Sequence, residues 1–169
     1  MLGGVRSGKS RLAERLAAQN GLAVTYVATA TAGDAEMRER IEAHRARRPN
    51  EWKLVEEPLA VGKVLRAHAL PGRVLIVDCL TLWLTNLLMD ADPQTLVRER
   101  ENLLTVLPTL AGEILLVSNE TGLGIVPSGE LARRFCDEAG MLHQALAACC
   151  DRVILTVAGL PYLLKGVSL

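Results

Sequence analysis

Apolar runs alternate with amphipathic stretches along the whole chain. The runs are short, continuous and rich in β-branched residues, which is typical of strands buried on both faces of a parallel sheet. Strands are predicted over Leu22–Ala30, Arg73–Leu80, Glu113–Ser118 and Asp151–Ala158, with a shorter one over Trp52–Glu57. The residues after Ala158, beginning with Gly159, Leu160 and Pro161, are predicted to form a short tail.

The stretches between these runs place their apolar residues three and four positions apart, as helices do. Helices are predicted over Arg11–Asn20, Ala35–Arg47, Pro58–Leu70, Leu82–Met89 and Pro93–Leu110, and Gly129–Cys150 is predicted as one helix or as two with a kink at Gly140. Because strands and helices alternate, the pattern predicts an α/β fold with a mostly parallel sheet flanked by helices.

The stretch Ala35–Arg47 is the most polar of these helices. Asp34 is a suitable N-cap, and apart from alanines only Met37 and Ile41 are apolar. A helix with so narrow an apolar face is either more exposed than most or faces a ligand.

The first ten residues carry the clearest chemical motif. They match the pattern G-x-x-x-x-G-K-[ST] of a phosphate-binding loop, whose backbone amides and lysine hold the phosphates of a nucleotide. The predicted loop consists of Gly3, Gly4, Val5, Arg6, Ser7, Gly8, Lys9 and Ser10. The Ser10 hydroxyl is a candidate ligand of Mg²⁺. A helix pattern follows at once and Gly21 can end it, which favours a true loop over a chance match.

The strand that should precede such a loop is curtailed. Only Met1 and Leu2 stand before Gly3, whereas a strand usually has about five residues. A start codon placed late or a shortened chain explains this better than a vestigial strand, although all three remain open at this point.

Two acidic residues follow predicted strands, at the edge of the sheet where ligands bind in parallel sheets. Asp78 ends an apolar run, as the magnesium-binding acid of nucleotide-binding proteins does. Its alternative role is to cap the end of the strand. Glu120 lies in a glycine-containing loop, where it either contacts a substrate or metal or holds the loop through backbone amides.

Composition narrows the possible partners. The 169 residues predict one domain over 1–169, and 19 basic residues balance 19 acidic ones. This balance argues against binding to nucleic acid or to an anionic membrane, and no apolar stretch is long enough to span a bilayer. The four cysteines form no C-x-x-C pair and no secretory signal opens the chain, so a reduced, cytoplasmic protein is expected.

His44 is the candidate nucleophile. It stands among Arg40, Arg45, Arg47 and Arg48, which would neutralise phosphates, and a neutral imidazole can attack phosphorus. The alternative is an exposed helix on which a single histidine has no role. His68 and His143 are predicted to be structural.

Several segments together resemble one enzyme family. These are GGVRSGKS (3–10), YVATA (26–30), RIEAHRARRP (40–49), the strand ending at Asp78 with TNLL (85–88) after it, NETGLGIVP (119–127) and LARRFCDEAG (131–140). The chain resembles the bifunctional adenosylcobinamide kinase / adenosylcobinamide-phosphate guanylyltransferases of cobalamin biosynthesis. The resemblance implies a RecA-like P-loop NTPase fold and a homotrimer.

The resemblance also implies two reactions. ATP or GTP phosphorylates adenosylcobinamide, and GTP then donates GMP to the new phosphate through a GMP-histidine intermediate. That histidine falls on His44, since Ala43 leaves no adjacent candidate. The implied nucleotide contacts are Gly3–Ser10, Ala28, Thr29, Ala30, Arg45, Ala46, Arg47, Arg48, Glu56 and Asp78, with Mg²⁺ on Ser10 and Asp78.

Three other functions remain open at the level of sequence. A small-molecule P-loop kinase without guanylyl transfer would keep Lys9 and Asp78 and make His44 incidental. A regulatory or motor-like ATPase would hydrolyse nucleotide for a partner. A non-catalytic nucleotide binder would fit the curtailed first strand.

Overall fold

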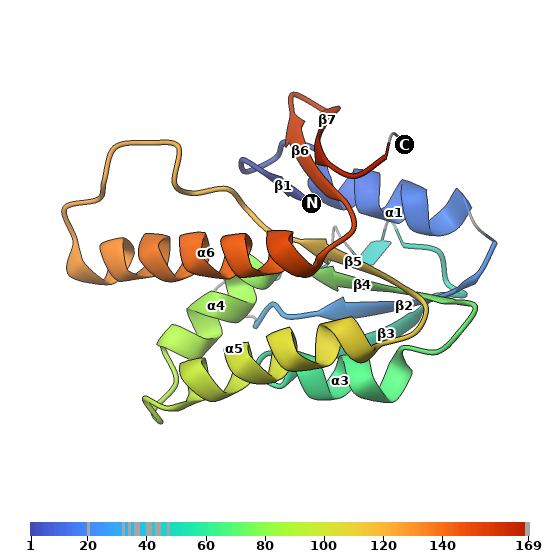
Figure 1. Cartoon of the computed structure of the whole chain (residues 1–169), viewed down its shortest axis with the longest axis horizontal. Coiled ribbons are helices and arrows are strands. Elements are labelled where there is room, and N and C mark those ends of the chain that lie inside the picture. Colours follow the sequence, from blue (N-terminus) through green and yellow to red (C-terminus); the bar gives the residue numbers. More distant parts are fainter. Residues whose placement is uncertain are drawn as a thin grey trace.

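Parallel strands form the centre of the molecule, as the apolar runs predict (Figure 1). The structure is a computed structural model that describes residues 1–19, 21–31, 33, 35, 38–39, 42, 45–46 and 48–167. The strands are β1 (Leu2–Gly3), β2 (Ala23–Ala28), β3 (Lys53–Glu56), β4 (Arg73–Asp78), β5 (Glu113–Val117), β6 (Val153–Val157) and β7 (Leu160–Lys165). The helices are α1 (Lys9–Gln19), α3 (Val61–His68), α4 (Leu80–Leu88), α5 (Thr95–Val106), the 3₁₀ turn η1 (Leu107–Thr109) and α6 (Glu130–Cys149).

The strands form two sheets, which are joined where β1 meets β5. Strands β3, β2, β4 and β5 pair in that order and are all parallel, while β1 pairs with β6 and β6 with β7. Three backbone hydrogen bonds join the two sheets: Met1 N to Leu116 O (2.6 Å), Ser118 N to Met1 O (2.9 Å) and Glu120 N to Gly3 O (3.0 Å). Strand β1, which leads into the phosphate loop, is therefore held between β5 and β6.

Strand β1 is short, as predicted, and it lies very close to β6. It has two residues, and Gly3 pairs with Thr156. A Cβ atom on Gly3 would lie 2.3 Å from the Thr156 carbonyl oxygen, and the φ of Gly3 is +151°. Only glycine fits at this position.

Helices cover both faces of the sheet because the strands are apolar on both faces. Helix α1 packs on one face, where Ala13 and Ala17 meet Tyr26 and Ile76. Helices α3, α4, α5 and α6 cover the opposite face, where their apolar side chains enclose Val27, Leu75, Val77 and Leu116. The alternation of side chains along each strand therefore decides which layer a residue joins.

Two predictions about the second half of the chain are settled by the structure. The residues after Gly159 are not a tail but strand β7, which pairs antiparallel with β6. Ala158 and Gly159 both have positive φ, as a two-residue hairpin turn requires, and Pro161 is tolerated because β7 lies at the edge of the sheet. Gly140 causes no break, since α6 is a single helix of 20 residues.

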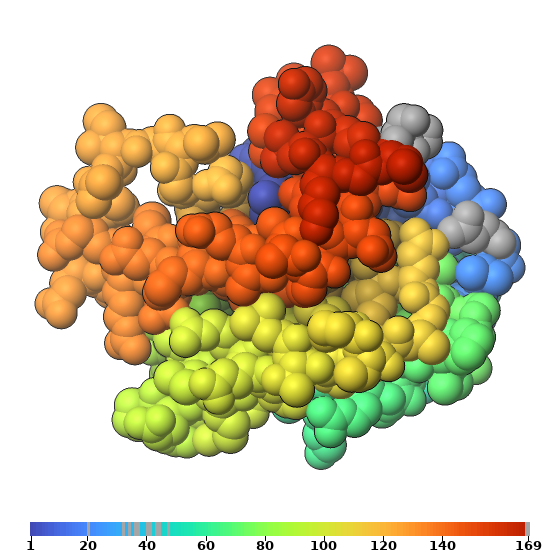
Figure 2. Space-filling view, viewed as in Figure 1, coloured from blue at the N-terminus to red at the C-terminus, as the bar shows by residue number. Residues whose placement is uncertain are grey.

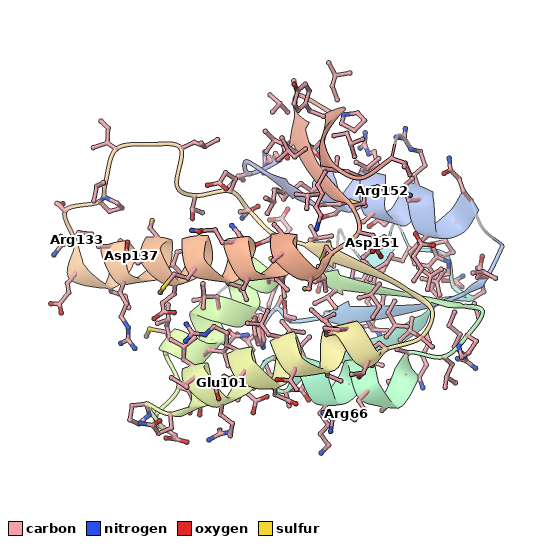
Figure 3. The ribbon with its side chains drawn as sticks, in the orientation of Figure 1. Arg66, Glu101, Arg133, Asp137, Asp151 and Arg152 are labelled. Carbon is pink, nitrogen blue, oxygen red and sulfur yellow. The ribbon has the colours of Figure 1, made fainter. Side chains whose placement is uncertain are left out.

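The surface mixes both signs of charge. Arg66, Glu101, Arg133, Asp137, Asp151 and Arg152 are all exposed, and they are spread over different parts of the molecule (Figure 3). The loop of residues 119–129, between β5 and α6, stands away from the body at one end (Figure 2). No helix in the described part of the chain combines the length and the apolar character that a membrane span needs.

Candidate functional site

The predicted phosphate loop lies between the end of β1 and the start of α1. Gly8 has a φ of +99°, and Arg6, at +55°, adopts a conformation that is uncommon outside glycine. The Ser7 amide donates to the Gly4 carbonyl oxygen (3.2 Å), which closes the loop. Because α1 begins at Lys9, its first amides and the positive end of its dipole lie at the loop.

Lys9 is buried within the loop, with 6% of its surface exposed. Its Nζ donates to the Gly4 carbonyl oxygen at 2.7 Å. Burial lowers the pKa of the Lys9 amine, and the Asp78 carboxylate opposes this by raising it. The strand register connects Asp78 with the loop: Asp78 is opposite Val117 on β5, and the next residue, Ser118, donates from its amide to the carbonyl oxygen of Met1, just before β1.

The strand register brings a second group of predicted residues together. Ala28 is opposite Glu56 on β3 and opposite Asp78 on β4, so the three residues form a row across the carboxyl ends of neighbouring parallel strands. Ligands bind at this edge in open parallel sheets. Glu56 is exposed there, whereas Ala28 and Asp78 are half-buried.

Thr29 has a structural role in this edge. It is completely buried, and its hydroxyl both donates to the Cys79 carbonyl oxygen (2.7 Å) and accepts from the Cys79 amide (2.9 Å). This pair of bonds ties the end of β2 to the end of β4. The side chain of Thr29 therefore shapes the site from within, and the half-buried Ala30 follows it.

Asn86 is a positioning residue that sequence reasoning noticed only as part of a motif. From α4 its side-chain amide donates to the Thr29 carbonyl oxygen (2.8 Å) and to the Pro58 carbonyl oxygen (3.1 Å). It thus connects the segments that follow β2 and β3. A lone asparagine in the stretch 80–88, which otherwise holds only apolar residues and two threonines, is the signal that could have identified it.

The arginine-rich segment is described only in part. Residues 35, 38, 39, 42, 45 and 46 are helical, in agreement with the helix predicted over Ala35–Arg47. Arg45 and Ala46 are exposed. His44 and Arg47 lie outside the described residues, so the structure does not place the candidate nucleophile. Arg48 is described, and its guanidinium carbon lies 3.9 Å from the centre of the Tyr26 ring.

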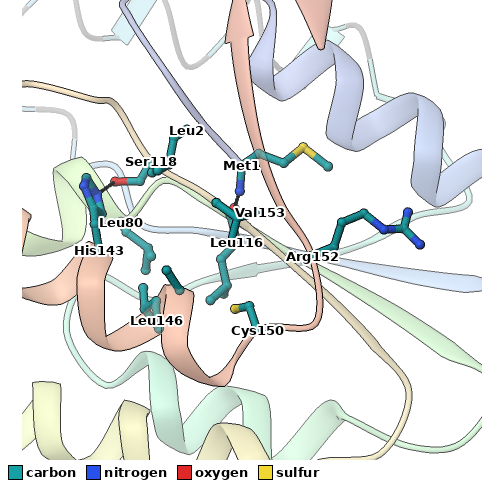
Figure 4. Close-up of a pocket in the computed structure, with 11 residues that line it drawn as sticks. Met1, Leu2, Leu80, Leu116, Ser118, His143, Leu146, Cys150, Arg152 and Val153 are labelled. Carbon is teal, nitrogen blue, oxygen red and sulfur yellow. Dashed lines mark hydrogen bonds between the residues drawn. The ribbon is translucent and has the colours of Figure 1, made fainter. Parts of the chain in front are cut away.

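A buried polar cluster supports the loop that begins at Asn119. Ser118 Oγ and His143 Nε2 are 2.8 Å apart (Figure 4). His143 Nδ1 lies 3.9 Å from Glu120 Oε2. Glu120 Oε1 accepts from the Gly122 amide (2.6 Å). Of the two roles considered for Glu120, these contacts favour holding the loop. Burial lowers the pKa of His143, and the Glu120 carboxylate opposes this by raising it.

Ser118 and His143 also line one end of a small pocket between β1, β5 and α6 (Figure 4). The pocket has a volume of about 40 Å³ and is otherwise lined mainly by apolar side chains, including Leu80, Leu116 and Leu146. Small-molecule sites usually occupy at least about 300 Å³. It is therefore a packing gap behind the phosphate loop rather than a nucleotide site.

The described residues suit a cation that is held mainly by a nucleotide. They contain no cluster of three or more His, Cys, Asp or Glu side chains arranged around a metal. Mg²⁺ in nucleotide-binding sites typically takes only one or two protein oxygens, with phosphates and water as its other ligands. Asp78 and the Ser10 hydroxyl at the start of α1 are of this kind, and Asp78 acts electrostatically on the phosphate-loop lysine.

This arrangement can bind a nucleoside triphosphate and transfer a phosphoryl or nucleotidyl group. Comparison with known proteins identifies the family. A family model described as cobinamide kinase / cobinamide phosphate guanyltransferase matches residues 1–164.

Curated relatives agree with this match over nearly their whole length. The bifunctional adenosylcobalamin biosynthesis protein CobP of Pseudomonas aeruginosa is 67% identical over 166 residues, which cover 98% of this chain and 96% of the relative. The bifunctional adenosylcobalamin biosynthesis protein CobU of Escherichia coli is 39% identical, and that of Salmonella typhimurium is 36% identical, each over 96% of this chain and 97% of the relative. The chain therefore belongs to the cobinamide kinase / cobinamide phosphate guanyltransferase family.

Proposed function

We propose that this protein catalyses two successive reactions on adenosylcobinamide. In the first, ATP or GTP phosphorylates the substrate. In the second, GMP from GTP is transferred to the new phosphate, which yields adenosylcobinamide-GDP and pyrophosphate. Family membership supports both reactions. The observation that carries the proposal is the strand register, which connects Asp78, at the ligand-binding edge of the sheet, through β5 to β1 and the phosphate loop that follows it.

In the kinase step the loop would grip the β- and γ-phosphates. The glycines allow the backbone amides of Gly3–Ser10 to approach the nucleotide, and Lys9 would exchange the Gly4 carbonyl for a phosphate oxygen. Ser10 and Asp78 would hold Mg²⁺, which neutralises charge on the phosphates when bound. Ala28–Ala30, Arg45–Arg48 and Glu56 complete the proposed nucleotide contacts.

In the second step His44 would act as the nucleophile. One nitrogen of its ring attacks the α-phosphorus of GTP, a P–N bond forms, and the bond from that phosphorus to the bridging oxygen breaks to release pyrophosphate. A phosphate oxygen of the substrate then attacks the same phosphorus, which breaks the P–N bond and restores the histidine. This assignment rests on the motif around His44 in the sequence.

The test is covalent labelling with GTP that carries the label on its α-phosphate. The wild-type protein should take up a label that is stable in alkali and labile in acid, as a phosphoramidate is. His44→Ala should take up none and lose about 10⁴–10⁶-fold in guanylyl transfer, while much of its kinase activity persists. Lys9→Ala should lose both activities because both need the triphosphate.

Two results would contradict the proposal. An unlabelled wild-type protein would remove the guanylyltransferase reaction and leave a small-molecule kinase. Equal behaviour of His44→Ala and Lys9→Ala in both assays would show that the two residues do not have separate roles.

Assembly and location complete the proposal. The family resemblance implies a homotrimer. Large apolar side chains that stay exposed in one chain favour self-association, and they lie in the loop after β5 (Leu123, Ile125, Val126) and on β7 (Leu160, Tyr162, Leu164). Light scattering should give the mass of three chains. All four cysteines are free, which suits the reducing cytoplasm.

A further inference from the structure

Tyr26 occupies an unusual place for a tyrosine. It lies on β2 within the apolar layer under α1, among Ala13, Val24, Ile76 and Val117, and only 2% of its surface is exposed. A phenylalanine would fill nearly the same volume there. A buried tyrosine hydroxyl needs a hydrogen-bond partner, and the identity of that partner indicates what the hydroxyl does.

The partner is the proposed cation-binding carboxylate. Tyr26 Oη donates to Asp78 Oδ2 at 2.6 Å. Tyr26 is opposite Ile76 on β4, so Asp78 lies two residues further along and on the same face of the sheet, within reach of the ring's polar end. The phenol supplies the proton of this bond, because an ionised carboxylate can only accept. A short bond to a carboxylate fixes the orientation of that carboxylate.

The face of the same ring contacts the arginine-rich segment. The guanidinium carbon of Arg48 lies 3.9 Å from the ring centre, the geometry of a cation–π contact. The Arg48 amide also donates to the Arg45 carbonyl oxygen (3.3 Å), so Arg48 is joined to the helical residues before it. In the sequence Arg48 follows His44 by four positions.

From these contacts we infer that Tyr26 is a positioning residue for both reactions, with a separate function for each part of its side chain. The hydroxyl orients the Asp78 carboxylate, and the ring face positions Arg48, which follows the proposed nucleophile by four residues in the sequence. The inference rests on the proposed function and deepens it. One buried side chain would then contact both the proposed cation-binding acid, Asp78, and Arg48 of the arginine-rich segment.

The two functions can be separated by mutation. Tyr26→Phe removes the hydroxyl and keeps the ring, whereas Arg48→Gln removes the cation from the ring and keeps the bond to Asp78. Tyr26→Leu removes both contacts. Tyr162→Phe is the matched control, because this other tyrosine lies on β7 with 67% of its surface exposed.

Two measurements distinguish the variants. The first measurement is the melting temperature of the protein as Mg²⁺ is added at a fixed GTP concentration. The Mg²⁺ concentration that gives half of the maximal rise is recorded, and this value reports binding and not turnover. The second is the single-turnover rate at which the α-phosphate label of GTP enters the protein at saturating Mg²⁺, with His44→Ala as the blank.

Tyr26→Phe should raise the half-maximal Mg²⁺ concentration about tenfold and should change the labelling rate at saturating Mg²⁺ much less. With GTP saturating for each variant, Arg48→Gln should raise the half-maximal Mg²⁺ concentration much less than Tyr26→Phe does, and it should slow labelling about tenfold. Tyr26→Leu should show both defects, and Tyr162→Phe neither. Because Arg48 is also a proposed nucleotide contact, slow labelling supports the role of the ring face only when Tyr26→Leu shows it too. If Tyr26→Leu does not fold, Tyr26→Met takes its place, since it also removes the aromatic face.

The inference is overturned if Tyr26→Phe and Arg48→Gln show the same pattern of defects, since a merely structural tyrosine would affect both measurements together. It is equally overturned if both variants match the wild type. A wild-type protein that takes up no label would instead contradict the proposed function, so the two failures are distinguishable.

Discussion

At the scale of single residues, some positions of the phosphate loop accept only glycine, because another atom lies where a Cβ would be. Gly3 is the clearest of these, because the Thr156 carbonyl oxygen lies where its Cβ would be. The neighbouring Gly4 belongs to the same loop, yet no atom lies within 4 Å of the place where its Cβ would be. Close packing therefore requires glycine at position 3 but not at position 4.

This difference gives the first stability prediction. Gly3→Ala should lower the free energy of unfolding by about 1–3 kcal/mol, because the new methyl group forces β1 away from β6. Gly4→Ala is the control and should change it by less than about 0.5 kcal/mol. Urea denaturation without nucleotide measures both. Equal losses in the two variants would show that the close approach of β1 to β6 has no energetic importance.

Residues also mark the limit of what the sequence predicts. The phosphate loop and Asp78 were predictable because each belongs to a local motif. Tyr26 and Asn86 were not assigned a role, because their partners are 52 residues and up to 57 residues away in the chain. Only the register of β2 against β4 brings Tyr26 to Asp78, and no local pattern encodes that register.

At the scale of elements, the hairpin of β6 and β7 is the main addition to the predicted fold. The sequence predicts only a short tail after Ala158, whereas the structure has strand β7 there, and Pro161 is acceptable in it because β7 lies at the outer edge of a sheet. The turn also explains a contact with the phosphate loop: the Gly159 amide donates to the Ser7 carbonyl oxygen (2.9 Å). The strands of the parallel core, by contrast, were predictable, because burial on both faces leaves a continuous apolar run.

The hairpin also caps the longest helix, which gives a second stability prediction. Lys165 Nζ on β7 donates to the carbonyl oxygens of Ala147 (2.8 Å) and Ala148 (3.1 Å), in the last turn of α6. Lys165→Gln should lower the free energy of unfolding by about 0.3–1 kcal/mol, because the helix loses a cation at its negative end.

Lys63→Gln is the control for this prediction, since Lys63 is an exposed lysine of α3. It should leave the midpoint of urea denaturation almost unchanged. The same small shift in both variants would indicate a general effect of lost charge instead of a specific cap.

At the scale of the whole molecule, stability depends on pH through the buried cluster of Ser118, Glu120 and His143. Burial lowers the pKa of His143 in the folded protein below the usual value of about 6.5. The unfolded chain therefore binds a proton before the folded protein does. The stabilisation is complete above the unfolded pKa and is lost as the pH falls below it.

The free energy of unfolding should accordingly decline between pH 7 and pH 5, by at most about 1.4 kcal/mol per pH unit from this residue. His143→Gln keeps a hydrogen-bonding side chain beside Ser118 and should make the decline shallower. Urea denaturation at a series of pH values measures it. Burial and the nearby Lys53 and Arg73 also lower the pKa of His68, so His68→Gln should remove a second, separate share of the decline. A profile for His143→Gln identical to the wild type would exclude His143 as an origin.

The way in which β1 is held has a practical consequence for spectroscopy. The amides of Ser118, Glu120 and Gly159 donate to the carbonyl oxygens of Met1, Gly3 and Ser7, although none of the three donors belongs to the phosphate loop. Their protons are natural reporters of that loop. Their chemical shifts and their rates of exchange with deuterium would reveal nucleotide binding from three surrounding sites, without any label on the nucleotide.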